Sequence, residues 1–180
     1  MVWLARIRTG MPKIHVCPLA HIQSTVRDTG ARSLVTLINP DYPVTRPDDI
    51  EPARHLRLSL ADVDVPTDAH VSPEAEHVRE LLRFARAWDR REPMLIHCYA
   101  GVSRSTAAAL IAVAALEPAR EERELAEELR RLSPTATPNK LLIAHADALL
   151  ARSGRLIAAV AAIGRGADCY EGVPFALEVA

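Results

Sequence analysis

The fold is decided by the stretch Pro93-Met94-Leu95-Ile96-His97-Cys98-Tyr99-Ala100-Gly101-Val102-Ser103-Arg104-Ser105 and by the apolar run that continues it to Leu116. Residues 93–97 are short and apolar, which predicts a buried β-strand, whereas residues 104–116 are apolar over a length typical of a buried helix. That run is too short to cross a bilayer, which takes about 20 residues. The sequence therefore predicts a strand, a tight loop and a helix, with Cys98 and Arg104 at the two ends of the loop.

The residues around this unit also alternate between strand and helix patterns. Alternation of this kind predicts a three-layer α/β fold, in which a central, mainly parallel sheet of four to five strands carries helices on both faces. Ligand sites in such sheets lie beyond the carboxyl ends of the strands. Further strands are predicted at residues 14–17, 33–38 and 55–60, and further helices at residues 21–28, 73–91, 118–132, 139–151 and 155–163.

Local signals set the expected ends of several elements. Ser72 is predicted to be an N-cap, and Pro73 and Pro118 are predicted to open two of the helices. Four prolines among residues 39–54 indicate a loop. The residues from Gly164 onward show little periodicity, so no element is predicted there.

Length and charge limit the organisation of the chain and its partners. A chain of 180 residues suits one domain with its own hydrophobic core. We expect a single domain at residues 11–165, a weakly ordered N-terminal extension at residues 1–10 and a C-terminal tail at residues 166–180. Lys and Arg number 22 against 23 Asp and Glu, so no overall basic field indicates nucleic acid as a partner.

The chain contains three widely spaced cysteines, Cys17, Cys98 and Cys169. This odd number favours neither a disulfide framework nor a zinc knuckle. The N-terminus lacks the apolar stretch of a signal peptide, so a reducing, cytoplasmic location is expected. The seven histidines show no metal-ligand spacing, so no metal or other cofactor is expected. Cys17 is interpreted as a core residue, with a regulatory disulfide to Cys98 as the alternative.

The loop between Cys98 and Arg104 has the chemistry of an anion site. Gly101 permits backbone conformations closed to other residues, and a loop of this size before a helix can turn its N–H groups toward an anion. The N–H groups and the helix N-terminus that favour an anion also stabilise a thiolate at Cys98, which makes Cys98 a nucleophile. The planar fork of Arg104 matches two phosphate oxygens. Ser105 is placed to donate a hydrogen bond to the sulfur, and His97 to hold the loop through backbone carbonyls.

A polar segment after the predicted strand at residues 55–60 supplies candidates for a general acid. Asp62, Asp64 and Asp68 all lie there, at the carboxyl end of a strand, as Cys98 does. Two different strand-to-helix connections therefore bring a carboxyl group and a thiol to the same edge of the sheet. From this position alone, all three aspartates are candidates for the acid.

The run His-Cys-x5-Arg-Ser at residues 97–105 resembles the signature of the protein tyrosine phosphatase superfamily. The similarity is closest to its small dual-specificity-like and bacterial members and extends over most of the chain. Residues 14–22 and 28–38 look like the first strand and the helix–Gly–buried-strand segment of that fold, and Pro138-Asn139 is similar to a Pro-Asn pair that follows the signature helix. In that family the acid follows a strand some thirty-odd residues before the cysteine, and Asp62 matches this pattern. The resemblance therefore makes Asp62 the preferred candidate for the acid, with Asp64 and then Asp68 as alternatives. No Trp-Pro-Asp motif is present, so the larger receptor-type enzymes match less well.

The resemblance implies a two-step reaction without a metal ion. Cys98 attacks phosphorus, Asp62 protonates the leaving oxygen and then activates water, and Arg104 binds the phosphoryl group together with the loop. The expected phosphate-binding residues are Tyr99, Ala100, Gly101, Val102, Ser103 and Arg104, supported by Ser105 and His97. A phosphorylated protein or a small phosphomonoester is the expected substrate, with phosphotyrosine preferred and dual specificity open.

Three other functions compete with this interpretation. A phosphoinositide or inositol-phosphate phosphatase on the same fold is less favoured, because such relatives often carry lysines in the loop and this loop has none. Sulfur transfer, as in rhodaneses, does not explain the Asp62 segment or the Arg-Ser ending. A non-catalytic phosphopeptide-binding module needs neither a nucleophile nor an acid.

Overall fold

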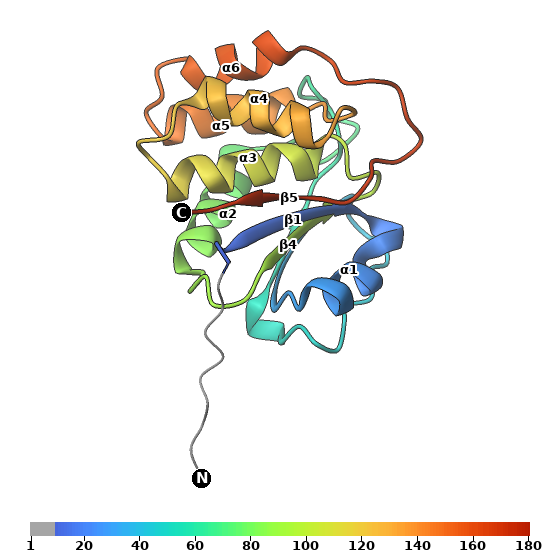
Figure 1. Cartoon of the computed structure of the whole chain (residues 1–180). Coiled ribbons are helices and arrows are strands. Elements are labelled where there is room, and N and C mark those ends of the chain that lie inside the picture. Colours follow the sequence, from blue (N-terminus) through green and yellow to red (C-terminus); the bar gives the residue numbers. More distant parts are fainter. Residues whose placement is uncertain (1–9) are drawn as a thin grey trace.

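The computed structural model describes residues 10–180, so the expected N-terminal extension falls almost entirely outside the described residues. Its centre is a sheet of five strands in the order β3-β2-β4-β1-β5 (Figure 1). The first four strands run parallel to one another, and β5 is antiparallel to β1. Their bounds are Lys13–Pro18 (β1), Ser33–Ile38 (β2), His55–Ser59 (β3), Met94–Cys98 (β4) and Phe175–Glu178 (β5).

Helices cover both faces of the sheet, which confirms the predicted α/β class. Figure 1 shows α1 on one face, with α3 directly against the other and α4, α5 and α6 stacked beyond it. None of the helices in the described part of the chain is long and apolar enough to cross a membrane. The helices are Ile22–Thr29 (α1), Ala75–Ala87 (α2), Arg104–Leu116 (α3), Glu122–Leu132 (α4), Lys140–Leu149 (α5) and Arg155–Ile163 (α6), with 3-10 turns at Leu19–His21 and Pro52–Arg54.

The two faces of the sheet bury two separate apolar clusters, because side chains alternate between the faces along each strand. The larger cluster holds Ile96 and Cys98 of β4 together with the whole buried side of α3. The smaller cluster lies toward α1 and consists of Cys17, Ile22, Val26, Ala31, Leu34, Ile50 and Leu95.

Two predicted helix starts are wrong. The second helix does not start at Pro73: Glu74 is its N-cap and donates its backbone N–H to Nδ1 of His77 at 3.0 Å. The Ser72 hydroxyl instead accepts from the backbone of Thr67. Pro118 likewise opens no helix. Its carbonyl accepts a hydrogen bond from Arg152, and α4 begins only at Glu122.

The second helix also ends earlier than predicted. It stops at Ala87, and Trp88 follows with an extended backbone. The indole Nε1 of Trp88 donates to the carbonyl of Glu92 at 2.9 Å, which closes the turn into β4. Trp88 is nevertheless buried with the apolar face of α2, as the periodicity predicts.

The expected C-terminal tail contains a strand that the sequence analysis did not predict. Residues 164–174 run from α6 past the sheet, and β5 then pairs with β1, with Leu177 opposite Ile14 (Figure 1). Leu177 and Val179 are fully buried in the main cluster. The last residues therefore complete one edge of the sheet.

Candidate active site

The loop of residues 99–103 joins β4 to α3 at the carboxyl edge of the sheet. Gly101 has a φ of +70°, a backbone conformation that favours glycine. A Cβ on Gly101 would lie 2.7 Å from the backbone nitrogen of Pro18, at the end of the neighbouring strand. The loop is therefore packed against the end of β1 so closely that only glycine fits.

Backbone donors from three other segments hold the carbonyls of this loop. Leu19 donates to the carbonyl of Tyr99 at 3.0 Å, and Gly172 donates to that of Ala100 at 2.8 Å. Thr137 donates to the carbonyl of Val102 at 2.9 Å. In a trans peptide the C=O and the following N–H point in opposite directions. The N–H groups that follow these carbonyls therefore face away from the three segments, as an anion cradle requires.

The structure places a hydroxyl beside the thiol of Cys98. Cys98 Sγ and Ser105 Oγ are 3.1 Å apart, and both side chains are buried. Ser105 lies in the first turn of α3, so the sulfur also lies near the N-terminus of that helix, where its dipole favours negative charge. Both features offer favourable contacts to negative charge on the sulfur.

Arg104 is buried and only partly satisfied by the protein. Its Nη1 donates to Asn39 Oδ1 at 2.8 Å and to the carbonyl of Leu60 at 2.9 Å. Its buried Nε has no hydrogen-bond partner among residues 10–180. An unpaired buried donor is costly, so this nitrogen is suited to bind an anionic oxygen.

Asp62 lies over the loop and is held there by two donors. Its Oδ1 accepts from Ser103 Oγ at 2.7 Å and from Asn139 Nδ2 at 3.0 Å. Its Oδ2 is 3.9 Å from Arg104 Nε, and the side chain is 38% exposed. The two oxygens therefore differ: Oδ1 is occupied by protein donors, whereas Oδ2 faces the unpaired nitrogen and is open to a ligand.

The other two candidate carboxylates lie elsewhere. Asp64 Oδ1 accepts from the backbone N–H of Lys140 at 3.2 Å, so it anchors the start of α5. Asp68 lies on an exposed stretch that lines a separate surface cavity with His70 and Pro73. Of the three aspartates, only Asp62 forms a hydrogen bond or ion pair with Arg104 or with the loop within residues 10–180.

His97 is fully buried and points away from the sulfur into a polar chain. Its Nδ1 lies 3.4 Å from the carbonyl oxygen of Cys98, and its Nε2 lies 2.7 Å from Thr36 Oγ1. Burial is the main reason why the pKa of His97 falls from 6.5 to about 4, so the ring is neutral at physiological pH.

Two asparagines complete the site, and the sequence analysis did not assign either of them a role. Asn39 holds Arg104, as described above. Asn139 is the N-cap of α5 through Oδ1, which accepts from Leu142 N, while its Nδ2 holds Asp62. Asn139 lies in the Pro-Asn pair that resembles the family pattern, and Asn39 directly follows β2, where site residues gather. These two positions are the features of the sequence from which a role in the site could have been predicted.

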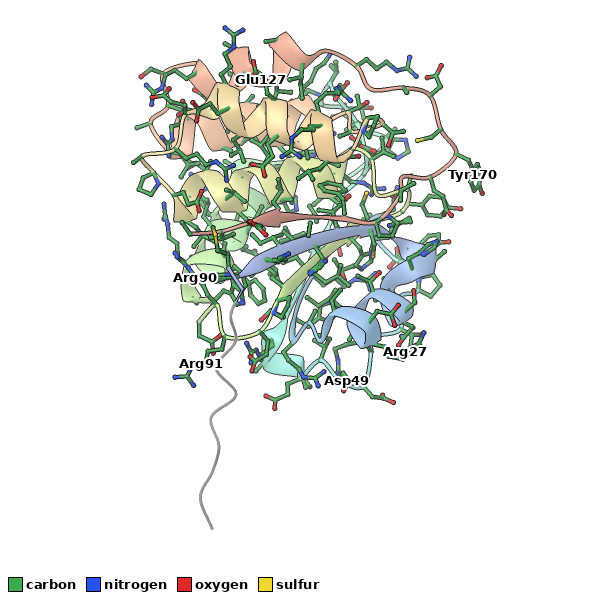
Figure 2. All side chains as sticks on the ribbon, in the orientation of Figure 1. Arg27, Asp49, Arg90, Arg91, Glu127 and Tyr170 are labelled. Atoms are coloured by element: carbon green, nitrogen blue, oxygen red, sulfur yellow. The ribbon has the colours of Figure 1, made fainter. Side chains whose placement is uncertain are left out.

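Tyrosine side chains line the outer side of the loop. The rings of Tyr42 and Tyr99 meet edge to face, with centroids 5.8 Å apart. Together with Ala100, Tyr170 and Glu171 they border a cavity of about 210 Å³. Figure 2 shows Tyr170 projecting from the C-terminal segment. No cluster of three or more potential metal-ligating side chains occurs within residues 10–180.

Comparison with known proteins gives one family match and a set of solved structures. The sequence profile of the protein-tyrosine phosphatase family matches residues 62–133, which run from Asp62 through α4. No curated protein sequence matches the chain significantly.

Several solved structures share the fold. The chain superposes on DUSP15 with a TM-score of 0.61 at 18% identity, covering 85% of this chain and 91% of that one. A mouse putative dual specificity phosphatase, complexed with zinc tungstate, gives 0.59 at 15% identity and covers 86% and 96%. PTPMT1 in complex with PI(5)P gives 0.54 at 19% identity and covers 77% and 91%.

The profile match over residues 62–133 and the loop at residues 98–104 make this chain similar to the protein tyrosine phosphatase superfamily. Its fold is that of the small dual-specificity members.

Proposed function

We propose that this protein hydrolyses phosphomonoesters through a cysteinyl-phosphate intermediate, and that protein phosphotyrosine is its substrate class. The observation that carries the proposal is the grouping of a buried thiol 3.1 Å from a hydroxyl, an unpaired buried Arg104 Nε, and Asp62 Oδ2 at 3.9 Å from that nitrogen. These are a nucleophile, an anion-binding donor and an acid in one place.

The first step transfers the phosphoryl group to sulfur. Cys98 Sγ attacks phosphorus while the bond from phosphorus to the ester oxygen breaks. Arg104 Nε and the loop N–H groups stabilise the charge on the transferring oxygens. Asp62 gives its proton to the leaving oxygen through Oδ2, since Oδ1 already accepts from Ser103 and Asn139.

The second step releases phosphate. Asp62, now a carboxylate, takes a proton from a water molecule that attacks phosphorus, and the bond from sulfur to phosphorus breaks. The half-exposed position of Asp62 lets water reach it. Ser105 donates to the departing sulfur, which makes the thiolate a better leaving group.

The aromatic border of the loop supports an aryl phosphate as substrate. Tyr42 and Tyr99 are 37% and 46% exposed, so their rings are available to pack against a phosphotyrosine ring. No side chain between Cys98 and Arg104 carries a positive charge, which disfavours a polyphosphorylated headgroup.

A phosphoinositide is the second candidate substrate. A groove of about 600 Å³ starts beside the segment that carries Asp62 and combines apolar walls with two cationic side chains. One structural neighbour was solved with PI(5)P bound. The groove is lined by Asp64, Thr137, Pro138, Lys140, Ile143, Ile157, Val160, Ala161, Gly164 and Arg165.

Hydrolysis of p-nitrophenyl phosphate in EDTA tests the reaction, and we expect turnover in the absence of added metal. Asp62→Asn should reduce kcat by roughly 10²-fold or more and flatten the acidic limb of the pH profile. The matched control Asp64→Asn should stay within about fivefold, because Asp64 only anchors α5. Strict dependence on a metal, or an Asp64→Asn defect larger than that of Asp62→Asn, would contradict the mechanism.

Substrate class is tested by comparing kcat/KM for a phosphotyrosine peptide with that for a water-soluble PI(5)P. We expect the peptide to be preferred, and Tyr99→Ala to reduce its kcat/KM by about tenfold while leaving that for PI(5)P within about twofold. A preference for PI(5)P that is lost in Lys140→Ala would favour the second candidate. Tight binding of the peptide without turnover would favour a binding module.

A further inference from the structure

A chain of three polar side chains crosses the sheet beneath the loop. Thr36 Oγ1 lies 2.7 Å from His97 Nε2 and 2.8 Å from His55 Nε2. His97 lies in β4, Thr36 in β2 and His55 in β3, and these three strands are neighbours in the sheet. Thr36 and His97 are fully buried, and His55 is partly buried. The proposed reaction assigns no role to Thr36 or His55.

This chain lies on the face of the sheet opposite the sulfur. Thr36 pairs in register with His97, so both side chains leave the same face. Leu34 and Leu95, two residues earlier on the same strands, belong to the cluster toward α1. Cys98 belongs to the other cluster, toward α3. The chain therefore reaches the nucleophile from behind, through the backbone of Cys98.

Counting protons fixes the direction of these hydrogen bonds. The Cys98 carbonyl can only accept, so the neutral His97 ring must carry its hydrogen on Nδ1 and leave Nε2 bare. The single hydroxyl hydrogen of Thr36 is then donated to His97 Nε2. Thr36 Oγ1 in turn accepts from His55, which must carry a hydrogen on Nε2.

The opposite direction would be unfavourable. It would place a bare Nδ1 of His97 against the lone pairs of the Cys98 carbonyl, in a fully buried position. An unmade hydrogen bond in such a position is costly. Protonation of His55 adds a hydrogen at its Nδ1 and keeps the one at Nε2, so the direction survives a charge change at the outer end of the chain.

We propose that Thr36 and His55 are positioning residues that fix the tautomer and orientation of His97 and, through the Cys98 carbonyl, the loop that stabilises the thiolate. This inference rests on the proposed function of Cys98 as the nucleophile. Without the Thr36 hydroxyl, His97 Nε2 loses the one donor that it has among residues 10–180, so the ring can rotate or change tautomer and release the carbonyl.

Several charged or titratable groups also face this chain and belong in any account of its pH dependence. His97 interacts with His55, Arg104 of α3 and Arg57 of β3. His55 interacts with Arg57 and with Arg46 of the loop after β2. All of these lower the pKa of the ring they face, after burial, which is the larger cause for both rings. Burial and these charges keep the His97 ring neutral, so that only one of its two nitrogens carries a hydrogen.

The first test measures alkylation of Cys98 by iodoacetamide against pH, with the modified peptide quantified by mass spectrometry. Thr36→Val should raise the midpoint of the rate profile by about one pH unit and lower kcat/KM for p-nitrophenyl phosphate about tenfold. Thr36→Ser keeps the hydroxyl and should restore both. The control Ser33→Ala removes another buried hydroxyl from β2, one that only accepts from Arg54, and should change neither.

The second test uses the outer residue and remains decisive if Thr36→Val does not fold. His55→Phe should produce the same upward shift, whereas His55→Gln keeps an amide donor near the Nε2 position and should restore the wild-type midpoint. Long-range ¹H–¹⁵N correlation spectra of the wild-type protein should show the Nδ1–H tautomer at His97 and the Nε2–H form at His55. An Nε2–H tautomer at His97, or an unshifted midpoint in folded His55→Phe, would overturn the inference.

The alkylation readout separates this inference from the proposed function. A protein that shows the midpoint shift but hydrolyses no phosphomonoester would support the positioning role and contradict the phosphatase assignment. An active phosphatase in which both folded variants keep the wild-type midpoint would do the reverse.

Discussion

Cys98 is the last residue of β4 and Cys17 the last but one of the neighbouring parallel strand β1, yet the two thiols have opposite surroundings. Pro18 pairs with Cys98 in register, Cys17 pairs with His97, and both cysteines are 1% exposed. Cys98 has Ser105 and the start of α3 beside it. Cys17 lies among aliphatic side chains, and burial raises its pKa to about 12.

The difference shows that burial alone does not decide the chemistry of a thiol. The face toward α1 keeps its groups neutral, because the pKa of Cys17 is raised and that of His97 is lowered. The face toward α3 offers donors to negative charge. A shift of one residue along the strand separates the two environments, because successive side chains point to opposite faces.

Substitution of the two cysteines gives the largest contrast. Cys98→Ser should lower the turnover of p-nitrophenyl phosphate by about 10⁴-fold or more, since it removes the nucleophile. Cys17→Ser should keep kcat within about twofold and mainly reduce stability, because it buries a hydroxyl in an aliphatic cluster. Steady-state kinetics and thermal unfolding of both variants measure the contrast. Equal losses of turnover would remove the functional distinction between the strand ends.

The contact between the two strand ends can be broken at Gly101. Gly101→Ala should reduce kcat/KM by roughly 10²-fold, because its Cβ would lie 2.7 Å from Pro18 N and displace the loop. Gly30 is the matched control. It has a φ of +71° and nothing within 4 Å of an added Cβ. Gly30→Ala should therefore cost about 1 kcal/mol of stability and leave turnover unchanged. Full activity in Gly101→Ala would contradict the tight packing of the loop.

Substitution of the hydroxyl residues near the two thiols, Ser105 and Thr25, should give a smaller difference in kinetics than substitution of the thiols themselves. Ser105→Ala should slow breakdown of the cysteinyl-phosphate by about tenfold, since the departing sulfur loses its donor. A pre-steady-state burst of p-nitrophenol would reveal it. Thr25 interacts with the thiol of Cys17, which has no part in the proposed reaction, and Thr25→Val should produce no burst. A Ser105→Ala variant in which only the first step is slowed would contradict the assigned role.

The buried, neutral His97 on the face toward α1 predicts that the free energy of unfolding depends on pH. The pKa of His97 is lowered to about 4 from 6.5, so between these values the unfolded chain binds a proton that the folded protein does not. Stability should therefore be complete above pH 6.5 and fall as the pH drops toward 4, by at most about 3.4 kcal/mol from this residue. His97→Gln should reduce this slope in a series of urea unfolding curves measured between pH 4 and pH 7. An unchanged slope in His97→Gln would contradict the neutral buried ring.

The sequence predicted the centre of the fold better than its margins. The unit from β4 through α3 is encoded locally, because an apolar strand, Gly101 and an apolar helix follow one another within a single stretch. The position of Asp62 relative to Cys98 also singled out the carboxylate that the structure places over the loop.

Features that depend on distant partners were not predictable in this way. Asn39 follows β2 and Asn139 lies in the Pro-Asn pair, but neither position names a partner. Their roles arise because the fold brings them to Arg104 and Asp62 across 65 and 77 positions. The four residues of β5 carry no strand pattern, and their pairing with β1 supplies the order. Ser72 and Pro73 were plausible helix signals, but the pairing of Glu74 with His77 sets the start of α2.

The hydrogen bond from Gly172 to the carbonyl of Ala100 has a consequence for the order in which the protein matures. During synthesis the thiol and its loop leave the ribosome well before Gly172 and β5 have been made. A nascent chain that ends at α6 holds Cys98, Arg104 and Asp62 but has neither this hydrogen bond nor the edge strand of the sheet. The loop therefore gains this hydrogen bond only after synthesis has passed Gly172 and the segment that ends in β5 has docked.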